Sequence, residues 1–587
     1  MSRAQVRGPT QAPIGTGEHL PGRFVYLADR SPDEVVLAEP AHKGWRDVTR
    51  AELNERVLAV AAGLVARGVG PGDRVALMSP TRVEWTIADL AILSAGGITI
   101  PLYDTSSAGQ CRRILDDAGA KLAFAATAEL ADRLEDAGAS EVLVFDDSGL
   151  AELTDDGAVE FTPEVGRRIG NLRQDDIATV VYTSGTTGGP KGCVLTHRNL
   201  VWTVRQTQAH LHAAIGQGGS VLQLLPLAHI FARLIQFVCL DAGLRVGFVR
   251  TSEPAHDIRA FSPTFLLAVP RLLEKVFEST RARASGVRRP LFDWAVSAGQ
   301  DWAGADRPGP LLRTRRAAAD LLVYRQVRNA LGGRVQYGMS GGAPLATELA
   351  RFYQAARIPI LEGYGLTETT APATVNTPGR QRIGTVGTPL PGVEIRIDGD
   401  GEILVRGGNV FGGYHRGGDQ QVDRSEFDDD WFRTGDLGML DDAGFLRIHD
   451  RKKDLIVTAN GKNVAPAPLE QRVESSDIVS QAMVVGDRRP FVAALVTLDD
   501  DELRAFAERH GIDGDPEGIR HHELVRREVQ RAVDHANEHV SRAESIRAFT
   551  ILDRQFTESD QELTPILKLR RSKIAEHFAK EIDAIYA

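Results

Sequence analysis

A stretch rich in glycine and hydroxyl side chains, residues 182–199, holds the densest set of ligand-binding groups in the sequence and reads YTSGTTGGPKGCVLTHRN. It follows a short apolar, β-rich run, which places it as a loop leaving a buried strand. Its glycines let backbone N–H groups approach a ligand closely, and its lysine adds a mobile positive charge. Such donors suit a polyphosphate better than a neutral ligand. The candidate contacts are Thr183, Ser184, Gly185, Thr186, Thr187, Gly188 and Lys191.

The spacing in this stretch excludes two other phosphate-binding loops. A Walker A loop places Ser or Thr directly after its lysine, whereas Pro190 precedes Lys191 here and Gly192 follows it. The dinucleotide pattern G-x-G-x-x-G is also missing from the stretch. The alternative is a solvated Gly/Thr turn between a strand and a helix, which the length of the string disfavours. The string resembles the phosphate-binding signature of adenylate-forming enzymes.

A second glycine-containing loop, residues 358–370, reads IPILEGYGLTETT. Tyr364 offers a flat ring that can stack on a base, Thr367 a hydroxyl for a phosphate oxygen, and Glu368 a carboxylate for Mg²⁺, which prefers oxygen ligands. Together with VQYGMSGGAPL at 335–345, the loop resembles the adenine and magnesium motifs of the same enzymes. The resemblance implies ATP contacts from Gly341, Gly342, Ala343, Tyr364 and Gly365, with Thr367 and Glu368 as catalytic residues.

Three further motifs follow in the order of this family. WFRTGDLG contains Asp436, a carboxylate suited to two ribose hydroxyls, although an Asp satisfying its own turn is the alternative. In DRKKD, the resemblance implies that Arg451 binds the nucleotide and that Lys453 is a hinge. In LTPILKLRRSK it places the essential lysine at Lys568, which composition alone would not single out. LIVTANGKN implies a coenzyme A tunnel at Gly461, with Asn460 where relatives have glycine.

Two segments bear on the substrate. His229 lies in the apolar string LQLLPLAHIFAR, where it is either a satisfied core residue or, as the resemblance implies, a gate to the acyl pocket. VPRLLE, residues 269–274, resembles long-chain fatty acyl-CoA synthetases in particular. The basic cluster Arg313, Arg315 and Arg316 is interpreted first as a solvated helix face, and second as a contact for anionic lipid or coenzyme A.

Composition limits the class of protein. The net charge of −10 argues against a nucleic-acid binder, although local donors can still hold ATP. Three widely spaced cysteines predict neither disulfides nor a zinc site and favour a reducing, cytoplasmic compartment. Since no apolar run approaches the ~18 residues that span a bilayer, membrane contact is expected to be at most peripheral, on the inner membrane face.

The elements that must position these residues alternate between helices and β-rich runs. Thr49 is expected to cap a helix, and strands are predicted at 74–78, 99–102, 122–125 and 142–145 with helices between them. We therefore expect an α/β fold: a large domain of two α/β subdomains with parallel-rich sheets and a small β-barrel-like subdomain, then a small mobile α+β domain. The predicted boundaries are a mobile lead-in at 1–23, the large domain at 24–450, a hinge at 451–454 and the small domain at 455–587.

The resemblance covers nearly the whole chain and implies two half-reactions. A medium- to long-chain fatty acid would react with ATP and Mg²⁺ to give acyl-AMP and pyrophosphate, and coenzyme A would then take the acyl group and release AMP. Two alternatives stay open: a fatty acyl-AMP ligase that hands its product to a carrier protein, and a nucleotide-binding sensor without catalytic activity. The joint presence of Lys191, Glu368, Asp436, Arg451 and Lys568 argues against the sensor.

Overall fold

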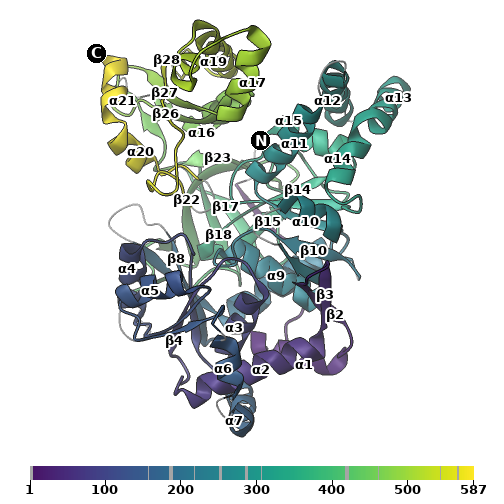
Figure 1. Ribbon diagram of the computed structural model, residues 1–587, viewed down its shortest axis with the longest axis vertical. Helices are drawn as coiled ribbons and strands as arrows, with labels where there is room; N and C mark the ends of the chain where they lie inside the picture. The colour runs from purple at the N-terminus through teal and green to yellow at the C-terminus, as the bar shows by residue number, and fades with distance from the viewer. Residues whose placement is uncertain are drawn as a thin grey trace. The chain divides into compact units, whose positions relative to one another are not determined.

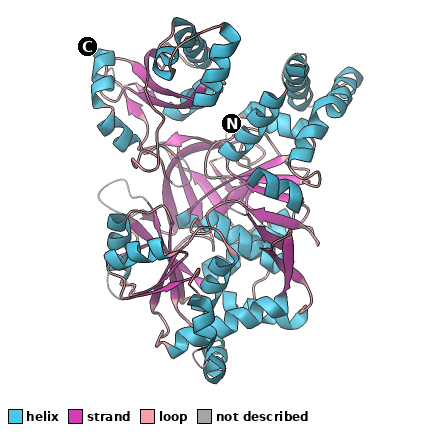
Figure 2. Cartoon of the chain, viewed as in Figure 1, coloured by secondary structure: helices cyan, strands magenta, loops and turns pink. Residues whose placement is uncertain are grey.

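A computed structural model describes residues 4–147, 149–155, 158–183, 190–216, 218–249, 254–284, 288–305, 307–416, 422–459, 462–542, 544–564 and 568–587. The chain divides into two compact units (Figure 1). Unit 1 contains residues 1–396, 404–433 and 440–447, and unit 2 contains 397–403, 434–439 and 448–587. Both units combine helices with sheets, as predicted (Figure 2).

One sheet of unit 1 is built from the predicted alternation of strands and helices. Its parallel part has the order β8-β5-β4-β6-β7, and β9 continues it antiparallel to β8. The strands are β4 (Arg74–Met78), β5 (Ile98–Leu102), β6 (Leu122–Ala125), β7 (Glu141–Val144), β8 (Ile177–Thr183) and β9 (Lys191–Thr196). The helices between them include α2 (Arg50–Ala66), α3 (Val83–Ser94), α4 (Ala108–Ala118) and α5 (Ala128–Asp136). Thr49 caps α2, accepting the Glu52 N–H at 3.2 Å.

A second sheet in unit 1 has nine strands, six of them parallel. Its members, in sheet order, are β16 (Thr388–Pro389), β15 (Ala371–Val375), β14 (Ile360–Leu366), β13 (Tyr337–Ser340), β12 (Phe265–Ala268), β10 (Ser220–Gln223), β11 (Arg245–Phe248), β2 (Val35–Pro40) and β3 (Trp45–Thr49). A fully buried ion pair joins α9 (Ile230–Ala242) to α3: Arg233 Nε donates to Asp89 Oδ2 at 2.8 Å. Because a lone buried charge is costly, the pair fixes how these two helices pack.

An insertion of helices follows β12. It comprises α11 (Pro270–Arg283), α12 (Arg288–Gly304), α13 (Pro310–Ala319), the π-helical turn η1 (Asp320–Tyr324) and α14 (Arg325–Ala330). Phe292 and Tyr324 from the insertion pack with Phe352 of α15 (Thr347–Ala355) in one hydrophobic core. The VPRLLE segment thus begins α11, and Leu273 is one of its buried residues.

The expectation of a mobile lead-in at 1–23 differs from the observed structure. Gln5–Arg7 forms β1, antiparallel to β17 (Glu394–Ile397), and the Ala12 N–H donates to Gln206 Oε1 at 2.7 Å. Helix α1 already begins at Leu20 and runs to Arg30. The Gly/Pro-rich composition of residues 1–23 did not indicate this strand pairing. An extended edge strand needs backbone partners, and it does not need an apolar pattern.

Unit 2 is an α+β domain around the sheet β26 (Val479–Val485), β27 (Val492–Leu498) and β28 (Ile546–Ile551). Its helices include α16 (Pro466–Val473), α17 (Asp500–His510), α19 (Glu523–Asn537), α20 (Arg571–His577) and α21 (Ala579–Tyr586). Helix α19 ends at Asn537, whose side-chain amide accepts the Ile546 N–H and donates to the Ile546 carbonyl. No helix in the described parts of the chain has the length and apolar character to cross a bilayer.

Candidate active site

The described parts of the glycine-rich stretch include the ends of two antiparallel strands of unit 1. Thr183 ends β8 and stands opposite Lys191, which begins β9, and the Thr183 hydroxyl donates to the Lys191 carbonyl at 3.4 Å. Five of the predicted contacts, Ser184, Gly185, Thr186, Thr187 and Gly188, lie outside the described residues. The end of the motif is structural, since Thr196 and Asn199 form a capping box for α8 (His197–Leu211).

Lys191 and Glu368 come from distant parts of the sequence and converge on one aromatic ring. Lys191 Nζ lies 4.8 Å from the centroid of the Tyr414 ring and 3.7 Å from Glu426 Oε1. The Tyr414 hydroxyl donates to Glu368 Oε1 at 2.7 Å. Burial raises the pKa of Tyr414, so the hydroxyl keeps its proton at neutral pH. Sequence reasoning predicted Lys191 and Glu368 but missed Tyr414.

The turn that carries Glu368 is held by a neighbouring loop. Thr367 begins the short helix η2 (Thr367–Thr369). The Phe411 N–H donates to the Glu368 carbonyl at 2.9 Å, and the Thr370 hydroxyl donates to the Asn409 carbonyl at 2.7 Å. Thr370 has a φ of 51°, an uncommon backbone conformation for a side-chain-bearing residue. Residues 409–414 therefore position Glu368, the candidate magnesium ligand. In the sequence, the one signal of this role is the glycine and aromatic residues of that turn.

The predicted adenine motifs meet at the same ends of two adjacent parallel strands. Ser340 at the end of β13 pairs with Glu362 in β14, and a Cβ on Gly341 would lie 3.4 Å from the Gly363 carbonyl oxygen. A Cβ on Gly365 would lie 2.1 Å from the Ala371 oxygen, so that position requires glycine. Gly341, Gly342 and Ala343 thus follow the carboxyl end of β13, and Tyr364 and Gly365 lie in the carboxyl-terminal half of the neighbouring strand β14. Parallel sheets of α/β proteins bind ligands at this edge.

A buried carboxyl group lies beneath these glycine turns. Glu362 is buried, and this burial raises its pKa to about 8, although backbone N–H groups of Gly384 and Leu345 favour the charged form. Its Oε1 has no hydrogen-bond partner among the residues that the structure describes. Such shifted groups gather at functional sites. Sequence reasoning missed Glu362, since the shift of its pKa depends on tertiary burial.

His229 has an identifiable structural role. It is the N-cap residue of α9, and its Nδ1 accepts the Phe231 N–H at 3.2 Å. The side chain is half-buried. Its ring orientation is therefore set by the helix start, and the gating role stays a prediction.

In unit 2 the predicted ribose carboxylate pairs with the predicted arginine. Asp436 Oδ1 lies 3.0 Å from Arg451 Nε, and the Asp436 side chain is only 4% exposed. The Asp436 N–H donates to the Thr434 hydroxyl at 3.1 Å, which holds the turn before it. The carboxylate is thus not merely satisfying its own turn.

Lys568 shares this neighbourhood of unit 2. Burial lowers its pKa to about 8; nearby Arg451 and Lys453 also oppose its charge, while Asp436 and Asp454 favour it. The Thr564 hydroxyl accepts the Lys568 N–H at 3.0 Å and so holds the backbone at this position. The structure therefore brings four separately predicted residues into one charged cluster, and the predicted Gly461 lies outside the described residues.

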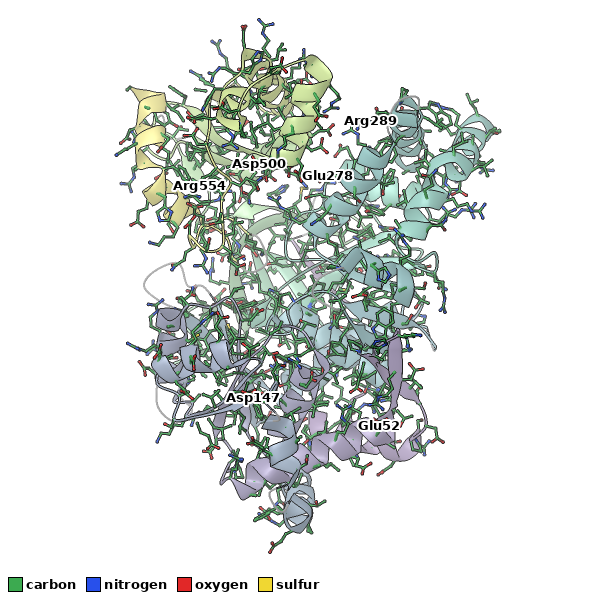
Figure 3. The ribbon with its side chains drawn as sticks, viewed as in Figure 1. Glu52, Asp147, Glu278, Arg289, Asp500 and Arg554 are labelled. Atoms are coloured by element: carbon green, nitrogen blue, oxygen red, sulfur yellow. The ribbon has the colours of Figure 1, made fainter. Side chains whose placement is uncertain are left out.

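A second layer holds the loop that carries Lys568. Glu562, fully buried as a side chain, accepts two bonds from Arg554, which Figure 3 labels, at 2.7 and 2.5 Å. Glu562 Oε1 also lies 2.9 Å from His577 Nδ1, and the Glu562 carbonyl accepts the Arg570 N–H at 2.7 Å. Sequence reasoning missed Glu562, because a glutamate in a polar loop looks solvated.

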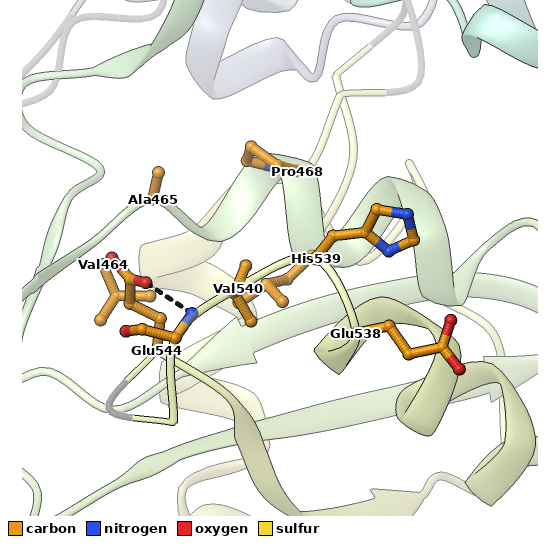
Figure 4. Close-up of a pocket in the computed structure, with 9 residues that line it drawn as sticks. Val464, Ala465, Pro468, Glu538, His539, Val540 and Glu544 are labelled. Carbon is orange, nitrogen blue, oxygen red and sulfur yellow. Dashed lines mark hydrogen bonds between the residues drawn. The ribbon is translucent and has the colours of Figure 1, made fainter.

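Unit 2 also contains a cavity of about 560 Å³ (Figure 4). It lies between the start of α16 and the segment after α19, where Glu544 accepts the Ser541 N–H at 2.9 Å. None of the predicted site residues that the structure describes lines it. The lining residues are Val464, Ala465, Pro468, Leu469, Glu538, His539, Val540, Ser541 and Glu544.

Comparisons with known proteins indicate the family and the fold of the chain. The long-chain-fatty-acid–CoA ligase FadD15 of Mycobacterium tuberculosis is 43% identical, with 98% of each chain covered, and long chain acyl-CoA synthetase 3 of Arabidopsis thaliana is 28% identical over 94% of this chain and 88% of its own. The adenylation domain of a carboxylic acid reductase from Segniliparus rugosus, solved with AMP, shares the fold with a TM-score of 0.74 at 20% identity, covering 98% of this chain and 95% of that one. Residues 24–415 match the AMP-binding enzyme family and residues 453–587 its C-terminal domain. The chain belongs to the AMP-binding enzyme family and has its fold, with a large N-terminal and a small C-terminal domain.

Proposed function

We propose that this protein activates a medium- to long-chain fatty acid with ATP and transfers the acyl group to coenzyme A. The observation that carries the proposal is the charged cluster of unit 2, where Asp436, Arg451 and Lys568 converge. An enzyme that makes an acyl adenylate needs a ribose contact and a cation near the reacting groups, and the carboxylate and the lysine of this cluster are suited to these two roles. The 43% identity to ligases named for long-chain fatty acids, and the VPRLLE segment, support the substrate class.

In the first half-reaction, a carboxylate oxygen of the fatty acid forms a bond to the α-phosphorus of ATP, and pyrophosphate leaves with the electrons of the broken P–O bond. Both reactants are anionic, so the protein must neutralise charge and align them. Lys568 is proposed to lie between the carboxylate and the α-phosphate. Lys191, with Thr183 and the residues of the loop that follows it, is proposed to hold the leaving pyrophosphate, and Tyr364 to stack on adenine.

Glu368 is the proposed magnesium ligand. Its carboxylate is half-buried and accepts the Tyr414 hydroxyl at Oε1, so Oε2 can face a hard cation while Oε1 stays oriented. A bound Mg²⁺ would supply charge neutralisation for the phosphates. The donor chemistry of this carboxylate fits that ion.

In the second half-reaction, the thiolate of coenzyme A forms a bond to the acyl carbonyl carbon, and AMP leaves with the electrons of the broken C–O bond. Lys453 is proposed as the hinge about which the small domain turns between the steps, and Gly461 as part of the thiol's approach. His229 is proposed to gate the acyl pocket. The protein would act in the cytoplasm, with peripheral contact to the inner membrane face.

The decisive experiment for this proposal measures ATP–pyrophosphate exchange and AMP release with fatty acids of increasing chain length. Exchange that requires a fatty acid, followed by coenzyme A-dependent AMP release, is the expected result. Exchange without thioester formation, together with transfer to a holo-carrier protein, would favour an acyl-AMP ligase instead. Nucleotide binding with no acid-stimulated exchange would favour a sensor.

A further inference from the structure

Three side chains of metal-binding types lie together at the end of a helix in unit 2. His535, Glu538 and His539 belong to the string HANEH, and one ligand atom from each lies within 4.8 Å of the other two. Among the described residues, they form the one such group of three His, Cys, Asp or Glu side chains. All three differ from the residues proposed for the reaction. The group therefore calls for an explanation of its own.

The helix places the three side chains on one face. Glu538 follows the last residue of α19, yet it keeps helical backbone angles, and its N–H donates to the Asp534 carbonyl at 3.1 Å. Positions 535, 538 and 539 are thus related by i, i+3 and i+4, the spacings at which helical side chains are neighbours. A different face of α19 packs its valines and alanines in the core of unit 2. A firmly packed helix therefore carries the three ligands.

The spacing of the ligand atoms is close to that around a bound metal ion. Zinc–ligand bonds of about 2.0–2.1 Å at tetrahedral angles place neighbouring ligand atoms about 3.3 Å apart. His535 Nδ1 and Glu538 Oε2 lie 3.5 Å apart. Because this separation exceeds that of a normal N–H···O hydrogen bond, the two groups do not hold each other tightly. His539 is exposed, so a change of rotamer can bring its ring to the same spacing.

A backbone contact selects the ligand nitrogen of His539. Its Nδ1 lies 3.1 Å from the His535 carbonyl oxygen. Because a carbonyl oxygen only accepts hydrogen bonds, Nδ1 carries the hydrogen in this contact, and Nε2 of the neutral ring keeps its lone pair. Histidines that bind metals usually donate their other ring N–H to a backbone carbonyl or a carboxylate in this way. His539 therefore presents Nε2 as a ligand.

The charges around the group favour a cation. The last carbonyl groups of a helix carry partial negative charge, and the exposed Asp534 lies one helical turn before Glu538. The guanidinium of Arg531, one turn before His535, is paired with Glu528 at 2.7 Å. The local charge therefore complements a divalent ion.

We propose that His535, Glu538 and His539 bind one divalent transition-metal ion of the Zn²⁺ class, with water in the remaining position. Two imidazoles and one carboxylate are a known ligand set for zinc, and three protein ligands leave one position open. Glu538 and His539 also line the cavity of about 560 Å³ in unit 2, which has room for that water (Figure 4). The bound ion would fix the turn that follows α19.

The test titrates the full chain, without a purification tag and stripped with a chelator, with Zn²⁺ in a calorimeter. Mg²⁺ is present in excess, so that the proposed magnesium ligand Glu368 stays occupied. Wild-type protein is expected to bind one Zn²⁺ ion, and to bind Zn²⁺ more tightly than Mn²⁺. Co²⁺ should give the spectrum of a nitrogen–oxygen site without a thiolate band, because the three cysteines are buried.

Two variants remove the ligands. His535→Gln/His539→Gln and Glu538→Gln should each bind Zn²⁺ at least about tenfold more weakly, because losing even a hydrogen-bond partner of a ligand costs about 10- to 100-fold. Zn²⁺ should also raise the Tm of the wild type more than that of either variant. Thermal unfolding without Zn²⁺ verifies that each variant is folded, and fatty-acid-dependent exchange tests the proposed function separately.

The matched controls remove the same side-chain types elsewhere. His256→Gln/His521→Gln removes two exposed histidines that each lie beside one carboxylate, and Glu523→Gln removes an exposed carboxylate from α19 itself. Both controls should bind Zn²⁺ as the wild type does. The inference is overturned if the wild type binds no Zn²⁺ in excess Mg²⁺, or if the ligand variants bind it equally tightly. A thiolate band with Co²⁺ would also overturn it, in favour of a cysteine site.

Discussion

Two lysines, one in each unit, are proposed to meet the same nucleotide, and their surroundings are opposite. Lys191 is 43% exposed and lies against an aromatic face and a carboxylate that is itself 47% exposed. Lys568 is half-buried among two other cations and two carboxylates, and its pKa is lowered to about 8. Lys191 begins a strand of a sheet, whereas the loop of Lys568 depends on a second layer of ionic contacts around Glu562.

The difference in exposure indicates that the two lysines have different roles in the reaction. A solvated lysine can follow a leaving pyrophosphate and exchange it for water at little cost, because its charge is already screened. A desolvated lysine interacts strongly with charge that develops close to it, but it must be held in place. We therefore propose that Lys191 holds the phosphates and that Lys568 stabilises the transition state.

The largest expected effect separates the two lysines. Lys568→Ala should lower fatty-acid-dependent ATP–pyrophosphate exchange on the order of 10²–10³-fold, the loss seen when one buried transition-state donor is removed. Lys191→Ala should lower it only about fivefold, mainly through a higher KM for ATP, because an exposed cation contributes about 1 kcal/mol. Equal losses in kcat for both variants would contradict these different roles of Lys191 and Lys568.

The next expected effect concerns the layer behind the metal ligand. Tyr414→Phe removes the hydroxyl that orients Glu368 and should raise the Mg²⁺ concentration needed for half-maximal exchange by about 10- to 100-fold. Tyr26→Phe is the control, because it removes an exposed hydroxyl that is distant in sequence from Glu368 and Tyr414. It should leave the Mg²⁺ requirement unchanged. An unaltered requirement in Tyr414→Phe would count against Glu368 as the magnesium ligand.

Several features of the molecule could be predicted from sequence, and the reason is local. The bounds of β4 and β6 match the predicted ranges, and Thr49 caps α2 as expected, because the apolar pattern and the capping residue are encoded within each segment. The predicted adenine residues meet because motifs that follow parallel strands end at one sheet edge. The second-layer residues could not be predicted, since Tyr414, Glu362 and Glu562 acquire their partners or their burial only in the folded chain.

The lowered pKa of Lys568 predicts a pH dependence. Because the ammonium form loses its proton above a pKa of about 8, exchange should fall about tenfold per pH unit at higher pH. Lys568→Arg keeps a positive charge throughout this range, so its residual exchange should not show the decline. A decline of the same size in both proteins would assign the titration to another group.

The smallest expected effect tests the support of the Lys568 loop. Glu562→Gln keeps the shape but weakens the pairs with Arg554 and His577, and it should lower kcat for exchange about tenfold with little change in KM. Glu576→Gln, which removes an exposed carboxylate paired with Lys573, is the matched control and should be near wild type. If Glu562→Gln slowed thioester formation from supplied acyl-AMP equally, its role would be general stability rather than positioning of Lys568.

Lys568 is proposed to serve the adenylation step alone. The most direct measurement supplies Lys568→Ala with synthetic fatty acyl-AMP and coenzyme A and follows acyl-CoA formation in a single turnover, beside ATP–pyrophosphate exchange by the same preparation. We predict that acyl-CoA forms at close to the wild-type rate while exchange is lost. Loss of both half-reactions to the same extent would contradict the account.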